Sequence, residues 1–295
     1  ELSILGYNSI NLPLGEIKIT RKVTALDIII RTCASVNMLT QNKKRLFEKE
    51  KIVYTLRTIK SLLNSALDPR LTSLDINFKV IDHNSTNENL KEIDNVFKKF
   101  GKKYSLINLD VSKFKNQIEK INQRGEDVTS NQISNMANIH QSLLESKSCE
   151  DLIYFVEDDY LHRKNSLKEM IFTYERITSQ LNKEIIICPT DYPYLYAKSE
   201  MTQNFLGHKY HWRRVNETLC TFLTSKNIIE KYWEKYIEMC KKEHAPFEKP
   251  LHDIYKKELC ISPIPSLALH FTNINSIFGL SPNVDWKKIW DENEN

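Results

Sequence analysis

Glycine is scarce in this chain, with only six glycines among 295 residues. The sequence contains neither the G-x-G-x-x-G pattern of dinucleotide-binding folds nor a Walker-type loop. Both motifs need glycine because the backbone has to approach phosphate groups closely. Their absence argues against a Rossmann dinucleotide enzyme and against a P-loop NTPase. A bound diphosphate would need another partner, such as a metal ion.

Paired cysteines, long apolar runs and a large charge excess are also missing. The six cysteines are scattered without a C-x-x-C pair, no apolar stretch is long enough to span a bilayer, and no secretory signal is evident. The net charge of +4 allows attraction to anionic surfaces without indicating nucleic-acid binding. We therefore expect a cytoplasmic protein with reduced cysteines and no nucleic-acid partner, for which peripheral contact with a membrane stays open.

Three consecutive acids, Glu157, Asp158 and Asp159, are the most informative feature that is present. They follow an apolar run at residues 152–156 that has the composition of a buried strand. Adjacent carboxylates repel one another, and a divalent cation such as Mg²⁺ or Mn²⁺ would relieve that repulsion. The alternative interpretation is a solvated acidic turn after a strand.

The order of the expected elements is typical of an α/β fold. Strand-like runs alternate with amphipathic helical patterns, at residues 25–32, 43–63, 76–81, 89–100, 131–145 and 152–156. This order predicts an open, mostly parallel sheet flanked by helices. Ligands of such sheets bind beyond the carboxyl ends of the strands, where Arg31, Asp82 and the three acids are expected to meet.

Three short segments together resemble the GT-A class of nucleotide-sugar-dependent glycosyltransferases. They read DHNST at 82–86, SNMAN at 134–138 and FVEDD at 155–159. The last looks like the DxD-type motif of that class in its Glu-Asp-Asp form. The chain departs from the commoner pattern because it has no Arg before Asn138 and no second acid beside Asp82.

The resemblance implies a single GT-A-like domain over residues 1–295. Residues of about 25–160 would bind the nucleotide sugar, and residues of about 161–295 would form a smaller acceptor-binding region and tail. Asp159 would bind Mn²⁺ or Mg²⁺, with Glu157 and a late histidine, His270, as further metal ligands. The expected nucleotide contacts are Arg31, Thr32, Asp82, Asn138 and Asp158.

Three of these assignments have a structural alternative. Arg31 could cap a strand end at the surface, and His270 could be an ordinary structural histidine. An Asx-turn is a common role for an aspartate such as Asp82, which is followed by Asn and Ser.

The acceptor side is predicted from the second half of the chain. Asp253 follows Pro250 and should lie near a helix N-terminus, where it could deprotonate the acceptor hydroxyl. Asp191 is the second candidate for this base. Trp212 and Arg213 are candidate diphosphate contacts, and Tyr192 is a candidate stacking surface for a sugar. A dipole-stabilising Asp253, a basic surface loop and tyrosines that simply pack are the alternatives.

Together with these patterns, the resemblance implies a metal-dependent glycosyltransferase that transfers a sugar from a UDP-sugar to a hydroxyl of a glycan or related acceptor. Inversion of the anomeric centre is favoured over retention. Two other functions stay open. One is a nucleotidyltransferase on a similar sheet, and the other is a non-catalytic module that binds polyanions or a membrane surface.

Overall fold

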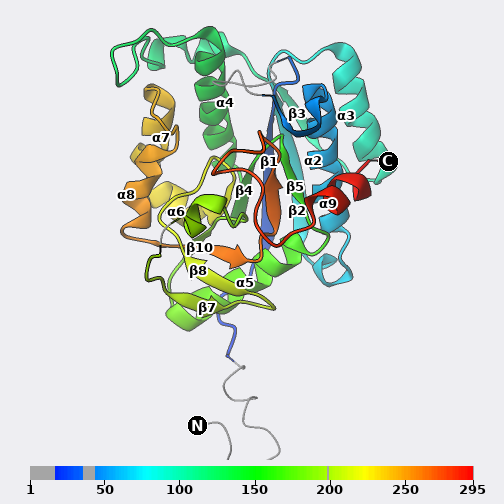
Figure 1. The fold of residues 1–295 in the computed structure, drawn as a ribbon, viewed down its shortest axis with the longest axis vertical. Coiled ribbons are helices and arrows are strands. Elements are labelled where there is room, and N and C mark those ends of the chain that lie inside the picture. The colour runs from blue at the N-terminus through cyan, green and yellow to red at the C-terminus, as the bar shows by residue number, and fades with distance from the viewer. Residues whose placement is uncertain (1–16, 36–43, 198, 295) are drawn as a thin grey trace, which may run out of the picture.

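The computed structural model describes residues 17–35, 44–197 and 199–294. Its centre is a nine-stranded sheet in the order β3-β2-β1-β4-β9-β6-β10-β8-β7 (Figure 1). The strands are β1 (Ala25–Thr32), β2 (Asp75–Asp82), β3 (Ser105–Asn108), β4 (Leu152–Glu157), β6 (Ile185–Ile187), β7 (Asn204–Leu206), β8 (His211–Arg214), β9 (Phe222–Ser225) and β10 (Leu259–Ile264). Every residue of β1 is buried, as expected for a strand covered on both faces.

Most strands of this sheet point in the same direction. β1 pairs in parallel with β2 and β4, β2 with β3, and β6 with β10. β9 runs antiparallel to β4 and β6, and β8 runs antiparallel to β7 and β10. Only β8 and β9 of the nine therefore oppose the others. The expected α/β class with a mostly parallel central sheet is confirmed.

The helices form two groups around the sheet. They are α2 (Lys51–Ala66), α3 (Asn87–Lys99), α4 (Ser130–Ser146), α5 (Ser166–Leu181), α6 (Lys226–Lys231), α7 (Trp233–Lys241), α8 (His252–Tyr255) and α9 (Trp286–Glu292). α2 packs against α3 and α5, whereas α4 packs against β1, β2 and α7. In Figure 1, α2 and α3 lie on the right of the sheet, and α4, α7 and α8 lie on the left.

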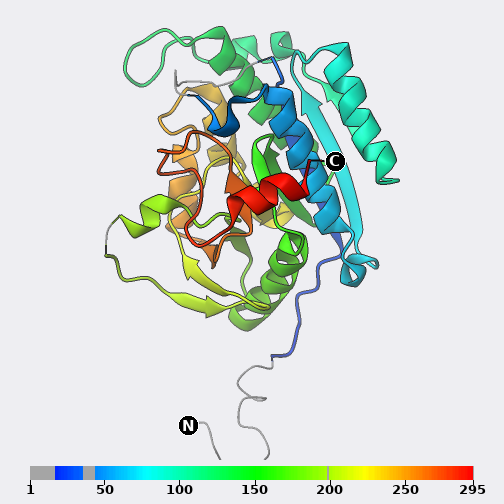
Figure 2. The same ribbon diagram turned by 45° about the vertical axis from the view of Figure 1, so that its right-hand side comes forward.

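A second, two-stranded sheet brings the end of the chain back to the three acids. β5 (Tyr160–His162) begins directly after Asp159 and pairs antiparallel with β11 (Ala268–His270), in a register that places Tyr160 opposite His270. The backbone N–H of Phe271 donates to the carbonyl of Asp159 at 2.8 Å. α9 then lies across α2 (Figure 2), with the Arg57 guanidinium of α2 over the Trp290 ring.

Element boundaries differ from the sequence expectation in two places. The helix expected at 43–63 begins at Lys51 in the structure, and residue 43 lies outside the described residues. The amphipathic sequence pattern of residues 226–242 predicts one helix, but the structure divides it into α6 and α7 at Tyr232, which has a non-helical φ of −117° and ψ of 25°. Within the described ranges, no helix has the length and apolar character needed to cross a membrane.

Candidate functional site

A cavity of about 940 Å³ lies at the carboxyl ends of β1 and β4. Both halves of the chain contribute to its wall, including α4 and the segment of residues 243–249 after α7. Seven of the residues selected from the sequence line it, namely Arg31, Thr32, Asn138, Glu157, Asp158, Asp159 and His270. The sequence therefore located the cavity correctly through its strand ends.

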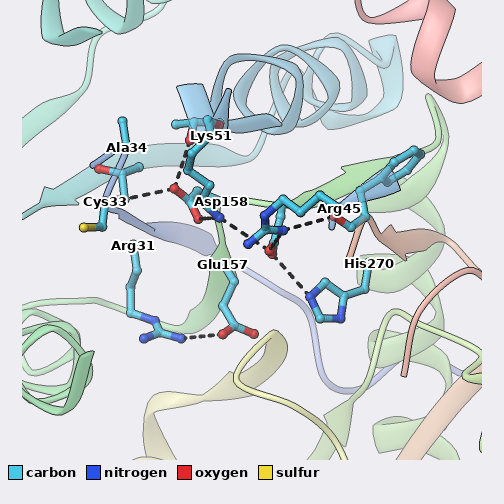
Figure 3. Close-up of polar contacts among 12 residues, drawn as sticks. Arg31, Cys33, Ala34, Arg45, Lys51, Glu157, Asp158 and His270 are labelled. Carbon is cyan, nitrogen blue, oxygen red and sulfur yellow. Dashed lines mark hydrogen bonds and ion pairs between the residues drawn. The ribbon is translucent and has the colours of Figure 1, made fainter. Parts of the chain in front are cut away.

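Each of the three consecutive acids is paired with its own cation (Figure 3). Glu157 Oε1 lies 3.1 Å from Arg31 Nη2. Asp158 Oδ1 lies 2.6 Å from Lys51 Nζ, and Asp159 Oδ2 lies 2.6 Å from Arg45 Nη1. The repulsion expected among the acids is therefore offset by cations of the protein itself, which is the main correction to the sequence interpretation.

Two of these cations come from a segment that the sequence did not point to. Lys51 is the first residue of α2, and Arg45 lies shortly before that helix. A positive charge at a helix N-terminus is disfavoured by the helix dipole, and burying an ammonium group adds a further cost. The exposed fraction of each of these two residues is only 7%. Their pairing with Asp158 and Asp159 offsets these costs.

Asp158 is bonded through both of its carboxylate oxygens. Its Oδ1 contacts Lys51, while Oδ2 accepts hydrogen bonds from Thr55 Oγ1 at 2.9 Å and from the backbone N–H of Cys33 at 3.3 Å. These contacts tie β4, the end of β1 and the first turn of α2 together. Asp158 is thus a structural anchor in which both carboxylate oxygens have partners within the protein.

Asp159 is held in its charged form. Burial acts to raise the pKa of its carboxyl group, but the charges of Lys51, Arg45 and His270 hold that pKa well below its usual range. His270 Nε2 lies 3.6 Å from Asp159 Oδ1, and the His270 ring stacks on Tyr160 at 4.5 Å between centroids. The Nδ1 atom of His270 is 2.8 Å from the Phe278 carbonyl. His270 and Asp159, both expected as metal ligands, therefore lie next to each other.

The acidic cluster does not suit a divalent cation, because its charge is already balanced. Among the described residues, no group of three or more His, Cys, Asp or Glu side chains is arranged to hold a metal ion. Asp159 Oδ1 and His270 Nε2, which lie 3.6 Å apart, are two atoms of this group that could act as metal ligands. The other oxygen of Asp159 contacts Arg45 and Lys51, so an added ion would stand close to two fixed positive charges. The role of Glu157, Asp159 and His270 as metal ligands stays a prediction.

Asp82 bonds within the polar turn after β2, through the backbone N–H three residues on, which is close to the Asx-turn that was the alternative to nucleotide binding. Its carboxylate accepts hydrogen bonds from Thr32 Oγ1 (2.7 Å), Ser85 Oγ (2.6 Å) and the Ser85 N–H (3.1 Å). It is buried and lies outside the cavity lining. Thr32 and Asn138 do line the cavity, and the Asn138 amide donates to the Ile81 carbonyl at 3.2 Å. Asp82 therefore shapes the turn rather than facing a ligand.

Three residues expected on the acceptor or diphosphate side are packed away from the cavity. Trp212 is fully buried, and the Tyr192 hydroxyl is 2.7 Å from that of Tyr160. Arg213 pairs with the buried carboxylate of Asp191, whose Oδ2 also accepts a hydrogen bond from Tyr196 at 2.5 Å. Neither Asp191 nor these three residues line the cavity. The expectation that they meet a ligand there is corrected, because the aromatic and ionic contacts serve packing.

Asp253, the first candidate for the base, is also outside the cavity. Its side chain is 49% exposed and lies between Lys256 at 2.8 Å and Lys235 at 3.3 Å. The local prediction was correct, since Asp253 is in the first turn of α8 after Pro250. The direction of its side chain, towards solvent, was not predictable from that position.

Glu248 is the carboxylic acid that faces the cavity in place of Asp253. It is only 3% exposed and lines the cavity. In the described part of the chain, no lysine, arginine or side-chain donor bonds to its carboxyl group, which distinguishes it from residues 157–159. Burial, together with the nearby charges of Glu157 and Glu217, raises its pKa to about 8. Glu248 directly precedes the short 3-10 turn Lys249–Leu251, which contains Pro250. Pro250 was therefore the sequence signal that could have pointed to Glu248.

Comparison with known proteins shows fold similarity only. No protein-family model matches the chain, and no curated protein does. The chain is similar to the inositol-1-phosphate CTP transferase from T. maritima, with a TM-score of 0.46 and 8% identity over 92% of this chain and 97% of that one. It is similar to S. aureus TarS 1–349 in complex with UDP, with a TM-score of 0.40 and 11% identity over 74% and 55%.

A third similar structure is the galactosyltransferase LgtC in complex with donor and acceptor sugar analogues. The TM-score is 0.37, with 14% identity over 72% of this chain and 65% of that one. The chain thus spans less than two thirds of the TarS fragment and of LgtC. At these values each similarity concerns the fold alone, and residue roles have to come from the cavity.

Proposed function

We propose that this protein is a glycosyltransferase that moves a sugar from a nucleoside-diphosphate sugar, with UDP as the expected nucleotide, to a hydroxyl group of a glycan or related acceptor. One observation supports this most: the same cavity holds buried cations, fixed by acids, and a separate unpaired carboxyl group, Glu248. A departing diphosphate needs positive charge, and an attacking hydroxyl needs a proton acceptor. The cavity offers both.

The proposed reaction is a direct displacement at the anomeric carbon. The acceptor oxygen forms a bond to that carbon while the bond from the carbon to the β-phosphate oxygen breaks. The hydroxyl proton passes to the carboxylate of Glu248, and the nucleoside diphosphate leaves with the bonding electron pair. Such a displacement inverts the anomeric configuration, in agreement with the outcome that the sequence favoured.

The position of Glu248 suits this role better than that of Asp253 or Asp191. Glu248 lies in the segment between α7 and α8, whereas Arg45 and Lys51 lie just before and at the start of α2, and all three line the cavity. Its raised pKa, about 8, lies near the pH at which a general base works well. Arg31, Thr32 and Asn138 are the proposed nucleotide contacts, because they line the same cavity.

A ligand panel followed by product analysis tests the proposal. Nucleoside diphosphates and nucleotide sugars should raise the melting temperature, because they bind only the folded protein. Incubation with donor and acceptor should then release a nucleoside diphosphate. Release of pyrophosphate would indicate a nucleotidyltransferase instead. Salt-sensitive binding of polyanions or vesicles without turnover would indicate a non-catalytic module.

A further inference from the structure

We propose that this chain binds the diphosphate of its donor through Arg45 and Lys51 rather than through a divalent cation. In this proposal Glu157, Asp158 and Asp159 are positioning residues that hold cations in place. The inference rests on the proposed function, because the ligand is the diphosphate of a nucleotide sugar.

The charges of the cluster carry the inference. The carboxylates of Glu157, Asp158 and Asp159 face three cationic side chains, with shortest contacts of 2.6–3.1 Å to Arg31, Lys51 and Arg45 respectively, and Lys51 also contacts Asp159. The six side chains therefore sum to no net charge. A strongly anionic pocket that would draw in Mn²⁺ or Mg²⁺ is absent from this group of described residues. The arrangement is instead one of three cationic side chains, each held in position by a neighbouring carboxylate.

The supporting contacts fix the ammonium group of Lys51 particularly well. Its Nζ lies 2.6 Å from Asp158 and 3.4 Å from Asp159. An ammonium group has three N–H donors, so two contacts with carboxylates leave one donor for a ligand. Lys51 and Arg45 both line the cavity. A phosphate oxygen in the cavity could therefore be bound without disturbing either ion pair.

Asp158 keeps this lysine in place because it is itself anchored. Thr55 and the Cys33 backbone hold the carboxylate oxygen that does not contact Lys51. Cations held in this way need little reorganisation when negative charge develops on a departing diphosphate. A bound metal ion would otherwise provide this stabilisation of the negative charge on the diphosphate. A metal ion added beside Asp159 would instead be repelled by Arg45 and Lys51.

Calorimetric titration with UDP, in EDTA and again in Mn²⁺, provides the test. We expect UDP to bind in EDTA, and Mn²⁺ to change its affinity by less than about threefold. Lys51→Met should weaken UDP binding in EDTA about tenfold or more, because one charge-assisted hydrogen bond to phosphate is lost. Uridine, which carries no phosphate, should bind both proteins equally. CDP, GDP and ADP serve as further probes if another base is preferred.

Lys168→Met is the matched control variant. Lys168 is as buried as Lys51, at 7%, and its Nζ lies 2.6 Å from an Asp68 oxygen, but it does not line the cavity. UDP affinity should be unchanged in this variant. If Lys51→Met folds poorly, the double variant Lys51→Met/Asp158→Asn removes both charges of the pair. Its stability should recover while UDP binding stays weak.

The possible results of these titrations distinguish a failure of this inference from a failure of the proposed function on which it rests. UDP binding that requires Mn²⁺ and is unaffected by Lys51→Met would overturn the inference and leave the proposed function standing. Recovery of UDP affinity in the double variant would also overturn it, because the loss would then be structural. If no nucleoside diphosphate binds in EDTA or in Mn²⁺, the proposed function itself fails.

Discussion

Two acidic regions of the same cavity are in opposite electrostatic states. In the turn after β4, each of Glu157, Asp158 and Asp159 contacts a cation. In the segment after α7, Glu248 has no such partner among the described residues, and its pKa is raised to about 8. The residue types are alike, so the difference comes from their neighbours: nearby cations favour a charged carboxylate, while burial without them favours a protonated one.

This contrast divides the proposed chemistry between the two regions. The acids that contact cations hold Arg31, Lys51 and Arg45 in place, whereas an acid that can gain and lose a proton near neutral pH can serve as a base. Two variants, each with a comparison variant, can break or sharpen this contrast.

The largest effect is expected for Glu248→Gln. The amide cannot accept the acceptor proton, so kcat for transfer should fall by about 10²- to 10⁴-fold. UDP affinity should stay unchanged, because Glu248 is not one of the proposed diphosphate contacts. Steady-state rates of nucleoside diphosphate release, measured beside calorimetric UDP titrations, check both statements.

Asp253→Asn is the control for that experiment, since its exposed side chain lies outside the cavity. It should retain wild-type kcat. A large loss in Asp253→Asn together with normal rates in Glu248→Gln would return the base to the position that the sequence favoured.

Asp158→Asn should lower the stability of the folded protein, because Asp158 is a positioning residue and not the proposed proton acceptor. It leaves the buried Lys51 ammonium without its closest charged partner, and the free energy of unfolding should fall by about 3 kcal/mol. Urea denaturation measures this loss. Glu48→Gln is a useful comparison, because Glu48 lies at the same 2.6 Å from Lys44 but in an exposed pair. It should cost about 0.5 kcal/mol or less. Equal losses would mean that burial does not strengthen the acid–cation pairs.

The last expected effect concerns Glu248 and depends on pH. Its pKa is about 8 in the folded protein against 4.5 for an ordinary glutamate. The unfolded chain therefore loses this proton first, and folding stability falls as pH rises from about 4.5 through 8. Glu248→Gln removes that loss, which is on the order of a few kcal/mol. Its melting temperature relative to wild type should be several degrees higher at pH 9 than at pH 5. A pH-independent difference in calorimetric scans would show that Glu248 is not buried uncharged.

The cavity was predictable from local patterns, because strand ends in a parallel sheet share one edge. Arg31, at the end of β1, and Glu157, at the end of β4, occupy paired positions in the sheet register. Their meeting therefore follows from strand order alone. Asp82 shows the limit of this rule, since its location was predicted correctly while its side chain turned to Ser85 and Thr32.

The cations and the base were not predictable in the same way. Arg45 lies 114 residues before Asp159, and Lys51 lies 108 residues before it. A lysine at the start of a helix gives no sign that it will be buried against a distant turn. Glu248 and Asp253 are five residues apart around one proline, and packing of the segment after α7 alone determined which of them faces the cavity.

By itself, the sequence determined the α/β class, the strands that end at the cavity and the three acids at its centre, because apolar periodicity and strand-end polarity are local properties. Only the tertiary structure decided what balances those acids and which carboxyl group is left unpaired. Charge state depends on burial and on neighbours within a few ångströms, and those neighbours come from more than 100 residues away.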